Sequence, residues 1–387
     1  MTNLAAVQKE KRLSGLDHLR ALAIVMVLFY HYRMFQHPEW LDKTIGFGWT
    51  GVDLFFVLSG YLISSQLFAQ IKAGTSISFP EFFIKRFFRI IPAYAVVLGI
   101  YFLIPAFHER EALPPLWRFI TFTQNFGFDI KHLGTFSHAW SLCVEEHFYL
   151  LLPLVLIALV RYGTERKGVL LLLVLFVAGF IVRLMIWNGI IIPAQGQDDF
   201  FVIWYRNIYY PTYTRLDGLL VGVGLALVFT FRTAVKDWCD KKGNLLLITG
   251  LLVLTGAWFL CEDQETFYAS VFGFPVVAMG YGLLVAAAVS ASCILYRYGS
   301  SITAFIAKLS FALYLSHKGV IHISQPLLEK TGIAPKGNLM FALCLILSLI
   351  GAYILNKAIE EPFLKIREKV LKHRRSRNEI VGIAERA

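Results

Sequence analysis

The chain has 387 residues and a net charge of +11; 57% of the residues are hydrophobic and only 16% are charged. Soluble domains carry about 25% charged residues because their surfaces meet water, so this composition excludes an ordinary soluble domain and favours lipid as the solvent. The positive charge does not indicate a nucleic-acid partner, because Lys and Arg lie in short clusters between apolar runs, as they do in the cytoplasmic loops of membrane proteins.

The N-terminus resembles a signal peptide, but we expect it to be retained. Lys9, Lys11 and Arg12 precede an apolar stretch, as in a secretory signal. The stretch lacks a small-residue cleavage site and carries His31 and Arg33 near its end. It is therefore predicted to be the first membrane span.

Windows of about 20 mostly apolar residues, long enough to cross a bilayer as a helix, can be placed ten times. They fall near 18–36, 49–70, 89–107, 139–160, 168–187, 212–231, 244–261, 271–292, 303–325 and 338–357. The sequence thus predicts an all-α polytopic membrane bundle of about ten transmembrane helices. One membrane domain covers 18–357, between a basic segment 1–17 and a basic tail 358–387.

The distribution of Lys and Arg predicts the orientation. The segments expected on the cytoplasmic side, together with both termini, are 1–17, 71–88, 161–167, 232–243, 293–302 and 358–387. The longest outer segments are 108–138 and 188–211. An aromatic and polar cluster in the second one fits either the mouth of a site or the ordinary interfacial aromatic belt. Its members are Trp204, Tyr205, Arg206, Tyr209 and Tyr210.

The five cysteines are predicted to act as small apolar residues. They are Cys143, Cys239, Cys261, Cys293 and Cys344, and only Cys239 is expected in a loop. Their wide spacing matches neither a disulfide framework nor a set of metal ligands, so no metal site is predicted.

Ionisable residues inside a span are costly in lipid, which makes each a candidate for function. Arg20 and His31 are eleven residues apart, about 20° beyond three turns, so they share one helix face about 16 Å apart along the first span. A single membrane histidine is often only a structural hydrogen-bonding group, and that alternative stays open.

The start of the fourth span carries a second candidate face. Ser141, Glu145 and Tyr149 recur every four residues and so lie on one side of a helix. The adjacent Glu145 and Glu146 cannot face the same partner, so one could be catalytic or pair with a cation while the other meets water. The structural alternative is an ion pair that holds two helices together.

Other polar residues are expected near the outer ends of spans or on a shared helix face. They are Asp53, Arg215, Asp217, Ser310, Tyr314 and His317. Small residues nearby would let helices approach closely, and the glycines among them are interpreted as packing residues rather than functional ones. They are Ser59, Gly60, Gly218, Gly222 and Gly224.

On the cytoplasmic side, Lys85, Arg86 and Arg89 precede Pro92 at the third span. Such a cluster fits either anchoring to anionic lipid headgroups or the binding of phosphates. Cations on the inside and a group of His, Glu, Asp, Arg and Tyr towards the outside suit a donor with a phosphorylated head and a long arm. Coenzyme A has that shape.

Ordered motifs across the chain resemble the acyltransferase type 3 family of bacterial membrane O-acyltransferases. In chain order they are Arg20-x10-His31, Gly51-Val-Asp-Leu-Phe-Phe-Val-Leu-Ser-Gly-Tyr-Leu-Ile63, Phe82-x3-Arg86-x2-Arg89-Ile-Ile-Pro, Trp140-Ser-Leu-x-Val-Glu-Glu-x-Phe-Tyr, Arg215-Leu-Asp-Gly-Leu-Leu-x-Gly222, Leu309-Ser-x-x-Leu-Tyr-Leu-x-His317 and Glu361-Pro362. The resemblance implies transfer of an acyl group, most often acetyl, from cytoplasmic acyl-CoA to a carbohydrate hydroxyl in the bacterial inner membrane. It also implies that Arg20 and His31 are required for activity and that Arg86 and Arg89 handle the donor.

The chain departs from the family pattern at two places. His147 stands where members usually have Gln, and Ser316 and Lys318 flank His317 where an aromatic residue and Pro are often found. The second departure leaves the role of His317 open. With no hydrolase-like domain after the last span, the resemblance is to the stand-alone form of the family.

The hypothesis from the sequence is that His31 acts as general base on the acceptor hydroxyl or accepts the acyl group itself. Glu145 would orient the imidazole or a second acceptor hydroxyl. Arg215 and Asp217 would bind sugar, with Asp53, Ser141, Tyr314 and His317 binding acceptor or supporting the site. Arg20, Lys85, Arg86 and Arg89 would hold the donor phosphates.

The expected partners are acyl-CoA, bound as a substrate rather than as a tight cofactor, a carbohydrate or glycolipid acceptor, and the bilayer. The oligomeric state stays open, a homo-oligomer included. The alternative function is a glycolipid or polysaccharide transporter or flippase, which would also have about ten spans and buried charges.

Overall fold

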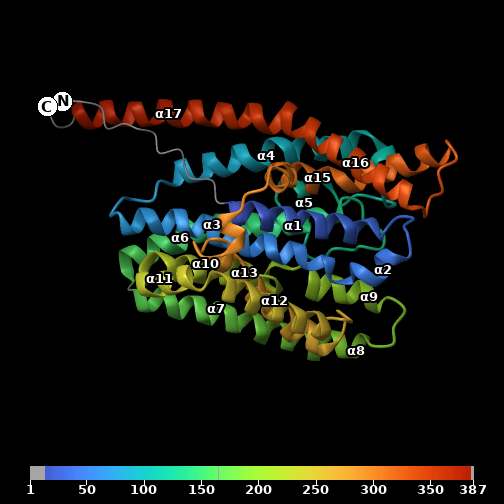
Figure 1. The fold of residues 1–387 in the computed structure, drawn as a ribbon, viewed down its shortest axis with the longest axis horizontal. Coiled ribbons are helices and arrows are strands. Elements are labelled where there is room, and N and C mark those ends of the chain that lie inside the picture. Colours follow the sequence, from blue (N-terminus) through green and yellow to red (C-terminus); the bar gives the residue numbers. More distant parts are fainter. Residues whose placement is uncertain (1–13, 164, 385–387) are drawn as a thin grey trace.

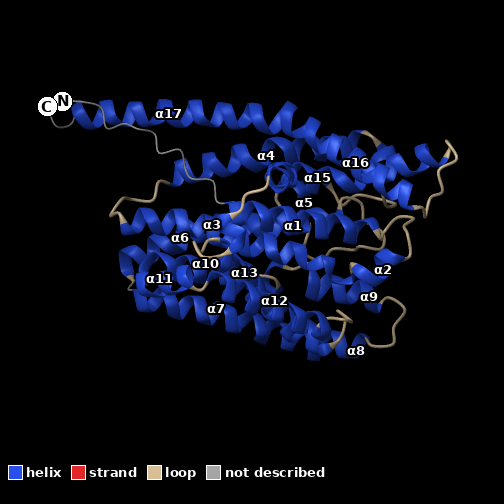
Figure 2. Ribbon diagram, viewed as in Figure 1, coloured by secondary structure: helices blue, strands red, loops and turns tan. Residues whose placement is uncertain are grey.

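The computed structural model describes residues 14–163 and 165–384. Every regular element in these ranges is a helix or a helical turn (Figure 2). The prediction of an all-α membrane bundle is therefore confirmed. Most of the predicted basic segment 1–17 lies outside the described residues.

Ten helices coincide with the ten predicted windows. They are α1 (Ser14–Tyr32), α3 (Gly51–Lys72), α4 (Phe79–Leu103), α6 (Trp140–Tyr162), α7 (Glu165–Ile186), α10 (Asp217–Phe231), α12 (Gly243–Leu260), α13 (Phe274–Ala288), α15 (Ser301–Glu329) and α16 (Asn338–Leu355). Shorter helices connect them: α2 (Trp40–Thr44), α5 (Leu116–Ile120), α8 (Ile192–Ala194), α9 (Phe200–Trp204), α11 (Thr233–Lys241) and α14 (Ile294–Arg297). Most of the long helices run along the long axis of the molecule (Figure 1).

Seven of the described helical segments are long and apolar enough to cross a membrane, or eight if the bent pair α10–α11 forms one span. Neither α1 nor α15 is among the seven. These two helices carry the polar residues Arg20, His31, His317 and Lys318, which lower their hydropathy. Both pack inside the bundle, α1 against α3 and α15, so their polar faces avoid lipid.

The two ends of the bundle differ in content. Helices α2, α8 and α9 lie at one end, whereas α11 lies at the other (Figure 1). The predicted outer segment 188–211, which holds α8 and α9, thus contributes to the first end, and the predicted basic segment 232–243, which holds α11, to the second. Which end faces the cytoplasm stays a prediction.

Two local expectations were wrong. Helix α4 begins at Phe79, ten residues before the predicted span, because the Ser78 hydroxyl accepts a hydrogen bond from the Glu81 amide and caps the helix. The basic cluster therefore lies on a helix. Cys239 lies in α11 rather than in a loop. All five cysteines are buried and free, as an apolar role requires.

The predicted basic tail is also helical. A π-helical turn over Asn356–Glu360 joins α16 to α17 (Glu361–Ala384). Helix α17 packs alongside α4 (Figure 1), and the centre of the Phe363 ring lies 6.4 Å from that of Phe88. The tail thus continues the last membrane helix instead of leaving the bundle as a loop.

Glycines allow α3 and α10 to approach closely, which supports their interpretation as packing residues. A Cβ at Gly60 would lie 2.3 Å from the Leu219 carbonyl oxygen, and one at Gly222 would lie 2.4 Å from that of Val57. Backbone atoms cannot yield to a side chain there. Close backbone approach is a usual source of helix association in membranes, where the hydrophobic effect does not act between helices.

We expect Gly222→Val to destabilise the bundle by about 1–3 kcal/mol or more, because the new side chain meets the α3 backbone. Gly256→Ala is the control, since a Cβ at Gly256 meets nothing within 4 Å. Thermal unfolding of the two purified variants in detergent measures the difference. Equal melting temperatures would contradict the tight contact.

Candidate active site

Two cavities lie between the helices, and most of the predicted site residues line one or the other. The first, here called the arginine cavity, is about 130 Å³. Its polar lining consists of Arg20, Ser59, Arg86, Arg89, Ser141, Glu145, Tyr149, Ser310 and Tyr314. The second, here called the histidine cavity, is about 570 Å³ and is lined by His31 and His138.

The arginine cavity brings together three of the four predicted donor-binding cations. Arg20 comes from α1, and Arg86 and Arg89 come from successive turns of α4. Arg89 pairs with Glu360 at 3.2 Å, and the Arg86 guanidinium lies 5.6 Å from the Tyr149 ring centre. Lys85 points elsewhere and pairs with Glu81 at 2.9 Å. The cavity therefore concentrates positive charge from two helices.

The predicted face of α6 is confirmed, because Ser141, Glu145 and Tyr149 all line the arginine cavity. Glu145 accepts hydrogen bonds from Ser59 at 2.8 Å and from Tyr149 at 3.0 Å. The first predicted role of Glu145, orienting His31, is wrong for this geometry, since its oxygens are engaged in the other cavity. Its second role, on an acceptor hydroxyl, stays a prediction.

His31 and His317 form a hydrogen-bonded pair between α1 and α15. The distance from His31 Nδ1 to His317 Nε2 is 2.8 Å, and the rings are nearly parallel, at 9°. His317 is fully buried, and its Nδ1 lies 2.9 Å from the carbonyl oxygens of both Leu313 and Tyr314. The structure thus gives His317 a definite partner in the predicted site.

These contacts fix the proton positions on both neutral rings. Carbonyl oxygens only accept, so His317 Nδ1 must carry a hydrogen, and its Nε2 must then be the lone pair. His31 Nδ1 must therefore donate to it, which leaves the lone pair of His31 on Nε2. A fixed tautomer with a free Nε2 is what a general base needs.

A third histidine, His138, was missed by the sequence analysis. Its ring centre lies 5.8 Å from that of His31 and 5.1 Å from that of His317. His138 lies two residues before Trp140, where the recognised motif begins, and was therefore not considered. Its position at the predicted outer end of a span could have marked it as a candidate site residue. Lys318, also missed, is buried beside this group and pairs with Glu109 at 3.0 Å.

The far side of the histidine cavity is aromatic. Tyr205, Tyr209 and Tyr210, carried on or next to a π-helical turn over Tyr205–Tyr209, line it. Of the two interpretations of the aromatic cluster, lining a site rather than forming an interfacial belt therefore fits these three tyrosines. Trp204 instead is fully buried and donates to the Ser270 hydroxyl at 2.8 Å, so it belongs to the core.

Five charged residues line the histidine cavity, and two of them, Arg33 and Lys131, form ion pairs with nearby aspartates; Arg110, Asp198 and Asp199 complete the set. Arg33 donates to Asp42 at 2.9 Å, and Lys131 donates to Asp199 at 2.7 Å. Hydrogen bonds from His37 and Arg33 lower the pKa of the Asp42 carboxyl, which keeps this pair charged at neutral pH. The rim thus offers charges of both signs, together with tyrosine rings.

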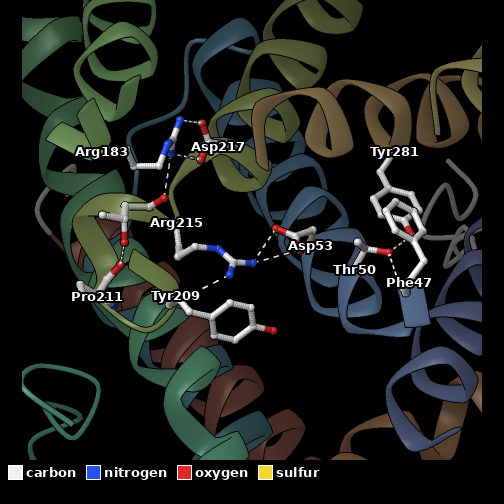
Figure 3. Close-up of polar contacts among 10 residues, drawn as sticks. Phe47, Thr50, Asp53, Arg183, Tyr209, Pro211, Arg215, Asp217 and Tyr281 are labelled. Atoms are coloured by element: carbon white, nitrogen blue, oxygen red, sulfur yellow. Dashed lines mark hydrogen bonds and ion pairs between the residues drawn. The ribbon is translucent and has the colours of Figure 1, made fainter. Parts of the chain in front are cut away.

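Two buried arginine–aspartate pairs support the walls of the site (Figure 3). Arg215 on the loop before α10 donates to both oxygens of Asp53 on α3, at 2.8 and 3.0 Å. Arg183 on α7 donates to both oxygens of Asp217 on α10, at 2.7 and 3.1 Å. All four side chains are 4% exposed or less.

The prediction that Arg215 and Asp217 bind sugar is therefore wrong: both are buried in ion pairs and line neither cavity. The Arg215 guanidinium lies 4.6 Å from the Tyr209 ring and 5.1 Å from the Trp140 ring, both of which line the histidine cavity. The ion pair of Arg215 with Asp53 thus packs behind residues that line the histidine cavity. It supports the site without lining it.

Comparisons with known proteins identify the family of the chain. A family model described as an acyltransferase domain matches residues 13–357. The chain is 30% identical over 340 residues to the peptidoglycan O-acetyltransferase OatA of Listeria monocytogenes, covering 83% of this chain and 51% of that protein. It is 29% identical over 334 residues to the O-acetyltransferase OatA of Staphylococcus aureus, covering 82% and 52%. The chain thus spans about half the length of these relatives. No solved structure matches it.

We expect Arg183→Leu to destabilise the protein by about 3–5 kcal/mol, because it leaves the Asp217 carboxylate buried without a counter-charge. Adding Asp217→Leu should restore much of the loss, since it removes the unpaired charge. Thermal unfolding in detergent of both variants tests this pair. A double variant less stable than Arg183→Leu would show that the pair does more than neutralise charge.

Proposed function

The chain belongs to this acyltransferase family, and from that membership and the two cavities we propose that it transfers an acyl group, most simply acetyl, from acyl-CoA to a hydroxyl of a cell-envelope carbohydrate. One observation carries the proposal: the hydrogen bond from His31 to His317 leaves the Nε2 lone pair of His31 free at a cavity open to an acceptor. A hydroxyl is a poor nucleophile at neutral pH, so it needs such a base.

In the proposed reaction, His31 Nε2 takes the proton of the acceptor hydroxyl while the hydroxyl oxygen bonds to the carbonyl carbon of the thioester. The C–S bond then breaks, and the thiolate of coenzyme A takes the proton back from His31. His317 holds the tautomer throughout. In the alternative route the same lone pair attacks the thioester, the C–S bond breaks, and the thiolate of coenzyme A leaves an acyl-histidine. The acceptor oxygen then bonds to the acyl carbon, the N–C bond to His31 breaks, and the hydroxyl proton goes to the thiolate. Mass spectrometry of the acid-quenched protein distinguishes the two routes.

The arginine cavity supports the choice of donor. Arg20, Arg86 and Arg89 line it, and Arg86 Nε is buried without a hydrogen-bond partner, which suits an incoming phosphate or carbonyl oxygen. At about 130 Å³ the cavity is too small for the nucleotide, so the arginines would hold the phosphates at its mouth while the thioester end of the arm enters. The donor would then bind as an exchangeable substrate from the cytoplasm.

The histidine cavity supports a carbohydrate acceptor. Tyrosine rings offer flat apolar faces and hydroxyl groups to a sugar, and charged groups of both signs at the rim can exchange hydrogen bonds with a polyhydroxyl compound. The relatives named above include a peptidoglycan O-acetyltransferase, so an envelope glycan is the proposed acceptor. This assignment puts the protein in the cytoplasmic membrane, with the histidine cavity on the outer side.

We expect His31→Ala to lower acyl transfer by about 100- to 10,000-fold, the usual effect of losing a general base. Membrane vesicles receive radiolabelled acetyl-CoA on the cytoplasmic face, and base-labile label is counted on extracted glycan. His373→Ala, on the exposed side of α17, is the control. Wild-type vesicles that move glycolipid without labelling it would support the transporter alternative instead.

The tautomer argument makes a separate prediction for His317. Removing the acceptor with His317→Ala should lower kcat by about tenfold or more, as expected for a hydrogen bond worth about 1.4 kcal/mol, while the KM for acetyl-CoA stays constant. His317→Gln should retain more activity, because its amide oxygen can accept from His31 Nδ1. Equal losses in both variants would argue against the orienting role.

A further inference from the structure

The wall between the two cavities is very thin. Of the described residues, Val52 on α3 lines both the arginine cavity and the histidine cavity. It is 4% exposed, so its side chain fills the space between them. At this point Val52 thus lies between the cavity lined by arginines and the cavity that holds His31.

The remainder of the wall is polar and held in position. Trp140 lines the histidine cavity, whereas the next residue, Ser141, lines the arginine cavity. The Tyr314 hydroxyl is 2.6 Å from Ser141 Oγ and 2.5 Å from the His138 carbonyl oxygen. Tyr314 therefore spans the wall from α15 to α6 and is fixed by hydrogen bonds at its tip.

Helix α3 is fixed beside Val52 as well. A Cβ added at Gly51 would lie 2.6 Å from the Ala23 carbonyl oxygen, so the start of α3 already touches the backbone of α1. Val52 also carries a β-branched side chain, which has little rotamer freedom in a helix. The width of the wall at this point is consequently set by the volume of the Val52 side chain.

The proposed reaction requires a group to cross this wall. The donor phosphates would lie with the arginines, yet the carbonyl carbon must reach His31, about 16 Å further along α1 than Arg20. We propose that the acyl end of the donor passes from the arginine cavity to the histidine cavity beside Val52, and that Val52 limits the size of the acyl group transferred. This inference rests on the proposed function and adds a specificity-determining residue to it.

The size limit follows from the chemistry of the wall. Tyr314 is held by two hydrogen bonds, whereas Val52 has no polar atom in its side chain and can be shortened without leaving a polar group unpaired. Val52→Ala removes two methyl groups, which widens the passage. Val52→Phe fills it. One methylene in an apolar pocket changes discrimination between substrates by about tenfold or more.

The first test compares acetyl-CoA with butyryl-CoA as competing donors in membrane vesicles. We expect Val52→Ala to raise the ratio of butyryl to acetyl transfer about tenfold. We expect Val52→Phe to abolish transfer while the affinity for coenzyme A, measured by calorimetry on the purified protein, stays within twofold. Val57→Ala is the control, since Val57 is buried on the same helix and lines neither cavity. An unchanged ratio in Val52→Ala, or an equal change in Val57→Ala, overturns the inference.

The second test does not depend on acyl transfer. A cysteine at Val52 is expected to react with a membrane-impermeant, negatively charged methanethiosulfonate added to either side of proteoliposomes, because both cavities reach it. The five native cysteines are buried and give a low background, and Val57→Cys is the control. Modification from neither side, or from one side only, overturns the passage. Modification from both sides with no acyl transfer by the wild type would leave the passage standing and remove the proposed function.

Discussion

Hydrocarbon offers no hydrogen-bond partners, so every buried charge of the bundle has to find its counter-charge on another part of the chain. Arg215 meets Asp53 and Arg183 meets Asp217, and together these contacts connect α3, α7 and the α10 region. Helix α7 depends on this most, because only 6% of its apolar window is buried. Arg183 fastens this mostly exposed helix to the core.

The same constraint separates supporting charges from functional ones. The carboxylates of the supporting pairs receive two hydrogen bonds each from their arginines and meet no cavity. Arg86 and Arg215 both keep a buried Nε without a hydrogen-bond partner, but only Arg86 lines a cavity. A buried donor left in this way costs free energy, which a ligand can recover by accepting from it. An uncompensated group at a cavity is thus a better sign of function than a buried charge alone.

Helices α1 and α15 place the two kinds of chemistry in sequence along the bundle. On α1, Arg20 lines one cavity and His31 the other; on α15, Tyr314 lines the arginine cavity, whereas His317 lines neither cavity and reaches His31 by a hydrogen bond. The cluster of arginines and the pair of histidines therefore lie in adjoining cavities. Both helices are too polar to qualify as apolar spans, and burial between other helices is what makes them tolerable in a membrane.

Hydropathy alone predicts the helical membrane class and the approximate positions of the spans. The 3.6-residue period of a helix predicts which residues share a face, and it does so for Arg20 with His31. The same period places Ser141, Glu145 and Tyr149 on one face. Periodicity relates residues on one helix and says nothing about the next. Tertiary structure alone decided that His317 and not Glu145 meets His31, that Arg215 and Asp217 are held in separate ion pairs, and that His138 joins the site. These outcomes depend on how helices distant in sequence are rotated against one another, which is set by packing between them.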